Sequence, residues 1–161
     1  MDNFRKATYL KLLFLLCVAI LITAYSIQYV FGFQPCNLCI IERIPFMLAI
    51  IVLILNYKFK KDQTFYSILL LLVFSFSFLI SVYHFGIEQG FLEESTVCVT
   101  KNVDLITKDE ILKSLKEVNI SCKDVTFKIF DLSLTTYNIF ISLLMLLISV
   151  KIYLINNENK K

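Results

Sequence analysis

The chain has 161 residues, of which 58% are hydrophobic, and it contains only three glycines and two prolines. This composition is too apolar for an ordinary soluble domain and indicates a membrane protein. The formal net charge is +3. No basic patch interleaved with aromatic residues accompanies that charge, so the composition does not indicate nucleic-acid binding.

Four long apolar stretches predict an all-α membrane protein, a four-transmembrane-helix bundle that forms one integral-membrane domain over residues 1–161. The first stretch is too long for a cleaved signal peptide and lacks a small-residue cleavage pattern after it, so we expect it to remain as a helix. The second stretch is short, because charged residues stand at both of its ends. The predicted spans are 12–33, 42–57, 65–87 and 132–154.

Basic residues predict the orientation of these spans. Lysine and arginine are enriched in cytoplasmic segments of membrane proteins. Both termini and the middle loop are therefore expected in the cytoplasm, and loops 34–41 and 89–131 outside. The second outer loop carries eight acidic residues against six lysines. The basic residues that set this orientation are Arg5, Lys6, Lys11, Lys58, Lys60, Lys61, Lys151, Lys160 and Lys161.

Four of the five cysteines fall in or beside the two outer loops, where disulfides can persist. Cys36 and Cys39 form a Cys-x-x-Cys pair where the first outer loop enters the second span. Cys98 and Cys122 lie in the second outer loop. Cys17 lies inside the first span, about 28 Å along the helix from Cys36, so we interpret it as a packing residue.

The Cys-x-x-Cys pair has the features of a reactive thiol centre. Unpaired N–H groups near a helix N-terminus favour a thiolate, and Arg43 adds positive charge. Pro45 disfavours helical geometry at the residue before it, so we expect the regular helix to begin only around Glu42. Cys36 and Cys39 would then lie in the turn ahead of that helix.

Arg43 has two interpretations. Its guanidinium could extend to the lipid headgroups and pair with Glu42. Alternatively, a cation beside a redox-capable pair, at the mouth of an apolar bundle, could bind a carbonyl of a lipid-soluble quinone and stabilise the anion formed on reduction.

The second outer loop contains the segment TKDEILKSLKEV. Thr107 and Glu110 form a capping box ahead of an apolar stripe, which predicts a short amphipathic helix in this loop. Taken alone, Cys98 and Cys122 fit a structural disulfide that stabilises the fold by about 3 kcal/mol. Beside a second disulfide at the membrane edge, the same pair could pass two electrons inward by thiol-disulfide exchange.

His84 and Glu88 lie four residues apart near the outer end of the third span. They could pair at the membrane interface and anchor the helix there. Ionisable residues in a span are also candidates for function, so His84 is a candidate for proton transfer or quinone contact.

These residues resemble the disulfide bond formation protein B (DsbB) family of bacterial inner-membrane thiol oxidases. The similarity rests on the segment PCNLCIIER, on the four spans, and on the two further cysteines in the long outer loop. It implies a multi-pass protein of the bacterial cell inner membrane, in contact with membrane lipid, that re-oxidises a periplasmic thioredoxin-fold dithiol protein (DsbA-like). It also implies electron transfer to a quinone, ubiquinone or menaquinone, in support of disulfide bond formation.

The resemblance also implies roles for individual residues. Cys98 would form the mixed disulfide with the partner, and Cys122 would exchange with Cys36. Cys39 would face the quinone with Arg43 beside it. Pro45 departs from the family's pattern.

Other functions stay open at this point. The four outer cysteines could surround a metal such as zinc. Alternatively, the chain could be a non-catalytic membrane subunit whose disulfides only stabilise its loops.

A covalent haem is disfavoured because Ile40, and not histidine, follows Cys39. An enzyme similar to vitamin K epoxide reductase is disfavoured because its Cys-x-x-Cys typically follows the loop cysteines, whereas here it precedes them.

Overall fold

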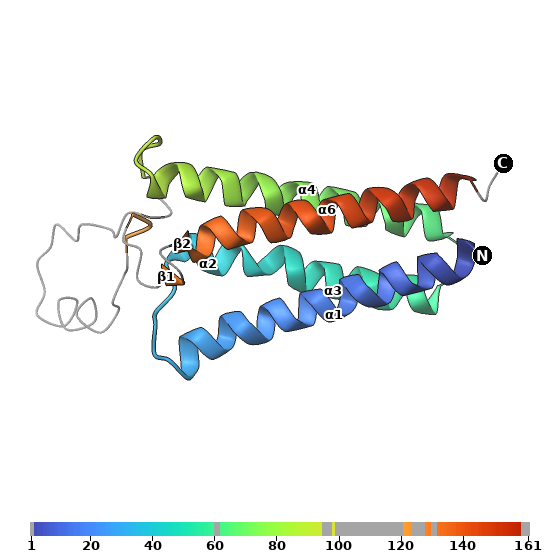
Figure 1. The fold of residues 1–161 in the computed structure, drawn as a ribbon, viewed down its shortest axis with the longest axis horizontal. Coiled ribbons are helices and arrows are strands. Elements are labelled where there is room, and N and C mark those ends of the chain that lie inside the picture. The colour runs from blue at the N-terminus through green and yellow to red at the C-terminus, as the bar shows by residue number, and fades with distance from the viewer. Residues whose placement is uncertain are drawn as a thin grey trace, which may run out of the picture.

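The computed structural model describes residues 2–59, 62–94, 98, 121–123, 128–129 and 132–158. Within them, four long helical segments lie side by side along one axis, and the two chain ends lie at the same end of the bundle (Figure 1). Each segment is long and apolar enough to cross a membrane, which confirms the four-helix prediction. The helices are α1 (Asp2–Tyr29), α2 (Asn37–Ile41), α3 (Arg43–Lys58), α4 (Gln63–Glu88) and α6 (Leu134–Glu158).

The helix ends differ from the predicted spans for a simple reason. Hydropathy marks the part of a helix inside the bilayer, and the polar residues at either end can continue the same helix. Helix α1 therefore begins ten residues before the predicted position 12, at Asp2, and α6 continues to Glu158. Helix α6 begins at Leu134, because the two residues before it form strand β2 (Leu132–Ser133), which pairs antiparallel with β1 (Lys128–Ile129). The predicted amphipathic helix at 107–118 lies outside the described residues.

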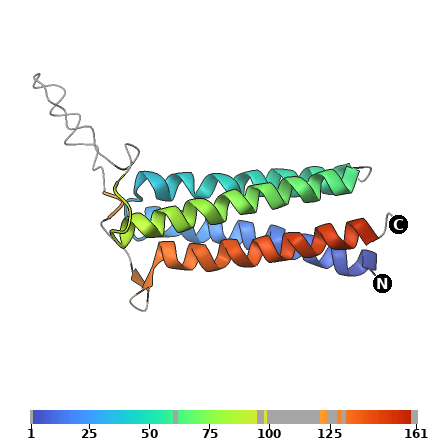
Figure 2. The same cartoon turned by 90° about the horizontal axis from the view of Figure 1, so that it is seen from above.

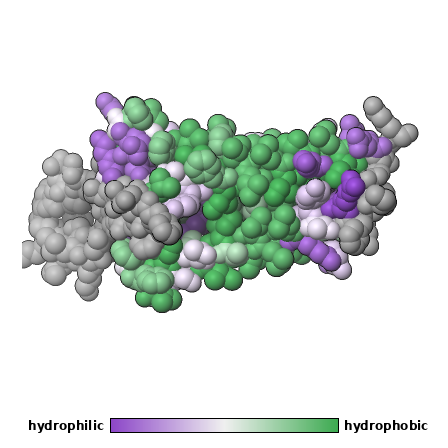
Figure 3. Space-filling view, viewed as in Figure 1, coloured by the Kyte–Doolittle hydropathy of each residue, from purple (hydrophilic) through white to green (hydrophobic). Residues whose placement is uncertain are grey.

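The bundle buries a small core, and most of its apolar side chains stay exposed on the outside of the helices. Helix α1 packs on α3 and α6, and α4 packs on the same two helices (Figure 2). Cys17 is fully buried in this core, as expected of a packing residue. Large side chains such as Leu72 and Phe140 remain 62% and 66% exposed. Hydrophobic residues cover the middle of the visible face and hydrophilic ones gather towards its ends (Figure 3), which suits a lipid environment.

Small polar residues line the contact between α4 and α6, the most extensive helix contact in the bundle. Ser77 and Ser142 are buried and their hydroxyl oxygens lie 3.0 Å apart. Nearer the end that holds the termini, Asn156 donates to Ser67. Small side chains allow two helices to approach closely in a membrane, and each buried hydroxyl or amide here has a partner.

The second span is broken near the end of the bundle opposite the termini (Figure 1). Pro45, the third residue of α3, has no N–H to donate to the carbonyl of Ile41, so the regular ladder is interrupted at Glu42. The five-residue helix α2 precedes the break, and Cys36 is its N-cap, whose sulfur accepts from the backbone N–H of Cys39 at 3.3 Å. The prediction that both cysteines lie in a turn is therefore wrong for Cys39, which lies inside α2.

A tight turn ends α4 on the same side of the bundle. Gly90 adopts a positive φ of 75°, which is favourable for glycine, and its N–H donates to the carbonyl of Ile87. The chain then folds back, and the N–H of Leu92 donates to the carbonyl of Gly86 at 3.0 Å. This turn closes the C-terminal end of α4, where His84 lies.

Candidate functional site: a thiol pair at the end of the bundle opposite the termini

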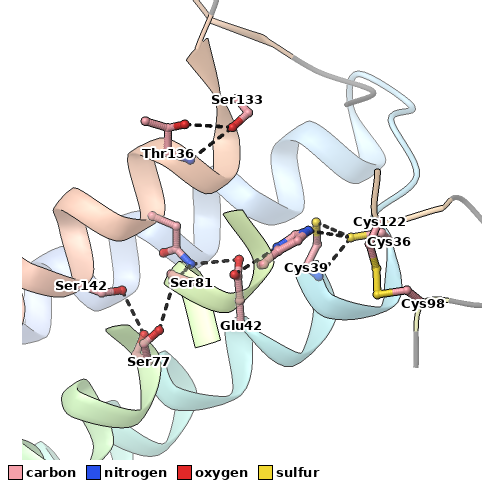
Figure 4. Close-up of polar contacts among 12 residues, drawn as sticks. Cys36, Cys39, Glu42, Ser77, Ser81, Cys98, Cys122, Ser133, Thr136 and Ser142 are labelled. Carbon is pink, nitrogen blue, oxygen red and sulfur yellow. Dashed lines mark hydrogen bonds and ion pairs between the residues drawn. A yellow bond between two sulfur atoms is a disulfide. The ribbon is translucent and has the colours of Figure 1, made fainter. Parts of the chain in front are cut away.

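The centre of the site is the pair of free thiols formed by Cys36 and Cys39 (Figure 4). Their sulfur atoms lie 2.8 Å apart. Cys36 is buried, with 6% of its surface exposed, whereas Cys39 is half-buried. Because the two sulfurs lie within hydrogen-bond distance, only a small movement of the side chains is needed for a disulfide to form when an oxidant accepts two electrons and two protons.

His84 joins this thiol pair from α4. Its Nε2 atom lies 3.5 Å from the sulfur of Cys36, and its Nδ1 atom lies 3.1 Å from Oε1 of Glu42. The side chains of His84 and Glu42 are only 3% and 9% exposed. The structure thus brings the predicted residue His84 to the thiols and pairs it with Glu42. The alternative in which His84 pairs with Glu88 is therefore wrong.

Glu42 connects the thiol centre to α6. Its Oε2 atom accepts a hydrogen bond of 2.9 Å from the side-chain amide of Asn138, and the same amide donates to Ser81 at 2.9 Å. The sequence predicted Glu42 as the charged end of a short span and as a possible partner of Arg43, and it did not identify Asn138 or Ser81 as part of the site. An acidic residue and an asparagine inside apolar spans are the signals that could have identified them.

The pKa of the Cys36 thiol is lowered to about 4. The largest cause is the hydrogen bond that the Cys39 thiol donates to the Cys36 sulfur, and burial of Cys36 opposes it. A hydrogen bond from His84 and the positive charge of its ring favour the thiolate further. Reduced Cys36 is therefore a thiolate at neutral pH.

Arg43 contacts two residues of α1. Its Nη1 atom donates to Oε1 of Gln28 at 2.6 Å, and its guanidinium carbon lies 4.9 Å from the ring centre of Tyr25. The interpretation that Arg43 pairs with Glu42 is wrong, since the carboxylate of Glu42 is held by His84 and Asn138.

An open apolar groove lies beside Arg43, between α1 and α3. Its volume is about 410 Å³. Tyr25, whose ring lies against Arg43, is one of its lining residues. The groove is lined by Val18, Leu21, Ile22, Tyr25, Ser26, Val30 and Ile50. A flat apolar ring with a polar edge would find both a hydrophobic surface and a cation here.

The two loop cysteines form the disulfide Cys98–Cys122, and each residue is 3% exposed. They pack in one buried cluster with Cys36, Leu38 and Ile87. Figure 4 shows the disulfide beside Cys36. The structure therefore brings all four predicted cysteines to one end of the bundle. In this state the sulfurs of Cys98 and Cys122 are bonded to each other and cannot serve as metal ligands.

The chain is similar to one protein family and to a relative from another organism. A family model described as "Disulfide bond formation protein DsbB" matches residues 6–152. A relative from Rickettsia prowazekii (strain Madrid E), named "Uncharacterized protein RP370", is 31% identical over 100 residues. That match covers 60% of this chain and 58% of the relative.

Proposed function

Because the chain belongs to the disulfide bond formation protein DsbB family, we propose that it is a quinone-dependent thiol oxidase that re-oxidises a periplasmic DsbA-like dithiol protein. Membership makes it a membrane protein of disulfide formation, in a family that is generally quinone-linked and acts with DsbA-like partners. The proposal that the chain oxidises a DsbA-like partner rests on one observation. The loop disulfide Cys98–Cys122 packs against Cys36, the buried thiol of the second pair.

This contact supports a two-step path for electrons. A thiolate of the soluble partner attacks Cys98, which forms a mixed disulfide and releases Cys122. The second partner thiol then resolves the mixed disulfide, so the partner leaves oxidised and the loop pair gains two electrons and two protons. In the next exchange, Cys122 attacks Cys36 of an oxidised Cys36–Cys39 pair and releases Cys39. Cys98 then attacks Cys122 in the resulting Cys122–Cys36 disulfide and releases Cys36, so the loop disulfide reforms and the Cys36–Cys39 pair becomes the dithiol.

His84 and Glu42 suit the second exchange. As Cys36 leaves its mixed disulfide with Cys122, it carries negative charge, which His84 stabilises from 3.5 Å. The Glu42 carboxylate orients the ring through Nδ1, and Asn138 in turn holds the carboxylate. We infer that Cys36 is the stable thiolate of the reduced pair. We also infer that Cys39 is the thiol that reacts with the quinone when the pair is re-oxidised.

A quinone fits the neighbouring groove. The groove between α1 and α3 offers an apolar surface of the kind that binds a lipid-soluble ring, and Arg43 stands at its edge over Tyr25. Arginine has five N–H donors, and Gln28 accepts from one nitrogen, so the guanidinium is able to bind a carbonyl oxygen as well. When bound, a quinone would supply the oxidant, accepting two electrons and two protons per disulfide formed.

The same proposal sets the location. We place the chain in the bacterial inner membrane with both termini in the cytoplasm. Helix α2 lies at the end of the bundle opposite the termini (Figure 1), and it contains Cys39 and is capped by Cys36. The thiol pairs would therefore face the periplasm. The basic residues near both termini support this orientation.

Reconstitution tests the proposal. Purified full-length protein is mixed with a reduced thioredoxin-fold partner and with ubiquinone or menaquinone, and quinone absorbance is followed. We expect quinone reduction that depends on the reduced partner and is abolished by Cys39→Ser. Cys17→Ala is the matched control, because Cys17 lies in the core away from the thiol centre. Normal turnover by Cys39→Ser would refute the assignment.

A trapping experiment separates this function from a purely structural role of the loop disulfide. In a Cys122→Ala variant, Cys98 can no longer form its disulfide with Cys122. When the soluble partner is supplied in its oxidised form, the Cys98 thiolate attacks the partner's disulfide and releases one partner thiol, so a mixed disulfide should accumulate. Non-reducing electrophoresis would detect it. A loop disulfide that only staples the fold has no reason to form such an adduct, so its absence would favour the non-catalytic alternative.

A further inference from the structure

Three potential metal ligands converge at the thiol centre. The sulfurs of Cys36 and Cys39 and a ring nitrogen of His84 all lie within 4.8 Å of one another. Two sulfurs and one imidazole form a donor set that zinc prefers, and catalytic zinc sites often use three protein ligands with a fourth position left for water. The residues come from α2, its N-cap and α4, so the folded bundle already holds the donors together.

The distances suit a tetrahedral ion after one small movement. With Zn–S near 2.3 Å and Zn–N near 2.0 Å, a sulfur and a nitrogen on one zinc lie about 3.5 Å apart, and two sulfurs about 3.8 Å apart. The Cys36 sulfur lies 3.5 Å from Nε2 of His84, which already matches. The sulfur of Cys39 lies 2.8 Å from that of Cys36, so it must move by about 1 Å. Cys39 is half-buried, which leaves room for this rotation.

The surroundings of His84 are those of a metal-binding histidine. A histidine that binds a metal through one ring nitrogen usually donates the other N–H to a carboxylate, which fixes the tautomer. Here Nδ1 faces Oε1 of Glu42 at 3.1 Å, and this arrangement leaves Nε2 directed at the thiols. Asn138 holds the other oxygen of Glu42 at 2.9 Å. The ring is thereby oriented before any ion binds.

We propose that Cys36, Cys39 and His84 form a redox-gated Zn²⁺ site, with water at the fourth position. The site exists only when the two cysteines are reduced, because a disulfide has no thiolates to donate. Binding displaces the remaining thiol proton of the pair into solution, and no electrons are transferred. Zn²⁺ has no redox chemistry of its own, so the bound ion holds the pair as thiolates. Bound Zn²⁺ would therefore block the thiol oxidase reaction, an inference that rests on the proposed function.

A metal titration tests the site directly. Full-length protein in detergent is reduced with a phosphine, freed of metal and titrated with Zn²⁺ against a chelating indicator. We expect one Zn²⁺ per chain in the reduced protein and none after the Cys36–Cys39 disulfide has formed. Co²⁺ in place of Zn²⁺ should give the absorption bands of tetrahedral thiolate coordination. Equal binding by the oxidised and reduced proteins, or no binding by either, would overturn the proposal.

Variants identify the ligands. His84→Ala should abolish the tetrahedral Co²⁺ spectrum, and Glu42→Gln should weaken Zn²⁺ binding about 10- to 100-fold through the lost support of the ring. Cys17→Ala should bind as tightly as the unaltered protein. A double variant, Cys98→Ser with Cys122→Ser, should also keep the site. Loss of the site in that variant, or tight binding by His84→Ala, would refute this ligand set. No quinone or partner is present, so failure here leaves the oxidase proposal intact.

Discussion

The reactivity of Cys36 should remain nearly constant as the pH falls from 7.5 to 5.5. Alkylation requires the thiolate. With its pKa lowered to about 4, Cys36 stays more than nine-tenths ionised across this range. An ordinary thiol with a pKa near 8.5 would lose thiolate roughly a hundredfold over the same interval. Because the pKa of Cys36 is lowered, its thiolate is protonated only in acid, and the alkylation rate should decline only once the pH falls below about 5.

The assay is timed alkylation of the reduced protein with iodoacetamide, followed by peptide mass spectrometry that resolves Cys36 from Cys39. Two variants form a matched pair. Cys39→Ser keeps a hydroxyl that can donate to the Cys36 sulfur and should preserve the flat profile. Cys39→Ala removes that donor, the largest cause of the low pKa, and should make the rate pH-dependent near neutrality. A hundredfold decrease in the unaltered protein between pH 7.5 and 5.5 would refute the reasoning.

Three further predictions concern stability. Asn138→Ala leaves a carboxylate oxygen of buried Glu42 without its amide donor and should cost about 1.5–3 kcal/mol, seen as a lower unfolding midpoint in detergent; unchanged stability would mean that this bond is not formed. Gly86→Ala would place a Cβ 2.8 Å from Cδ1 of Leu92, the end of a flexible side chain that is 43% exposed and free to turn aside, so stability should change by less than about 1 kcal/mol; a larger loss that Leu92→Ala restores would show that Leu92 is held in place. Gly90→Ala should cost about 1–2 kcal/mol because φ is 75°, whereas Gly90→Asn should cost less; equal losses would argue against a left-handed residue there.

The break in the second span shows which structural features a local sequence pattern can predict. Pro45 correctly predicted that the regular helix begins near Glu42, since a missing N–H acts on the residues immediately before it. The same pattern did not reveal helix α2 or the role of Cys36 as its N-cap. Those features depend on a side-chain sulfur accepting a backbone N–H, which the residue order does not specify.

The sequence by itself determined the four spans and the presence of a thiol pair at the end of one of them. Long apolar stretches must form helices in lipid, because every backbone group there needs an internal partner, and this requirement is local. The tertiary structure alone decided which side chains meet. His84 lies 48 residues from Cys36 and could have faced Glu88, and Arg43 could have faced Glu42 instead of Gln28. These choices depend on how the helices rotate and pack against one another, and helical periodicity carries no information about a neighbouring helix.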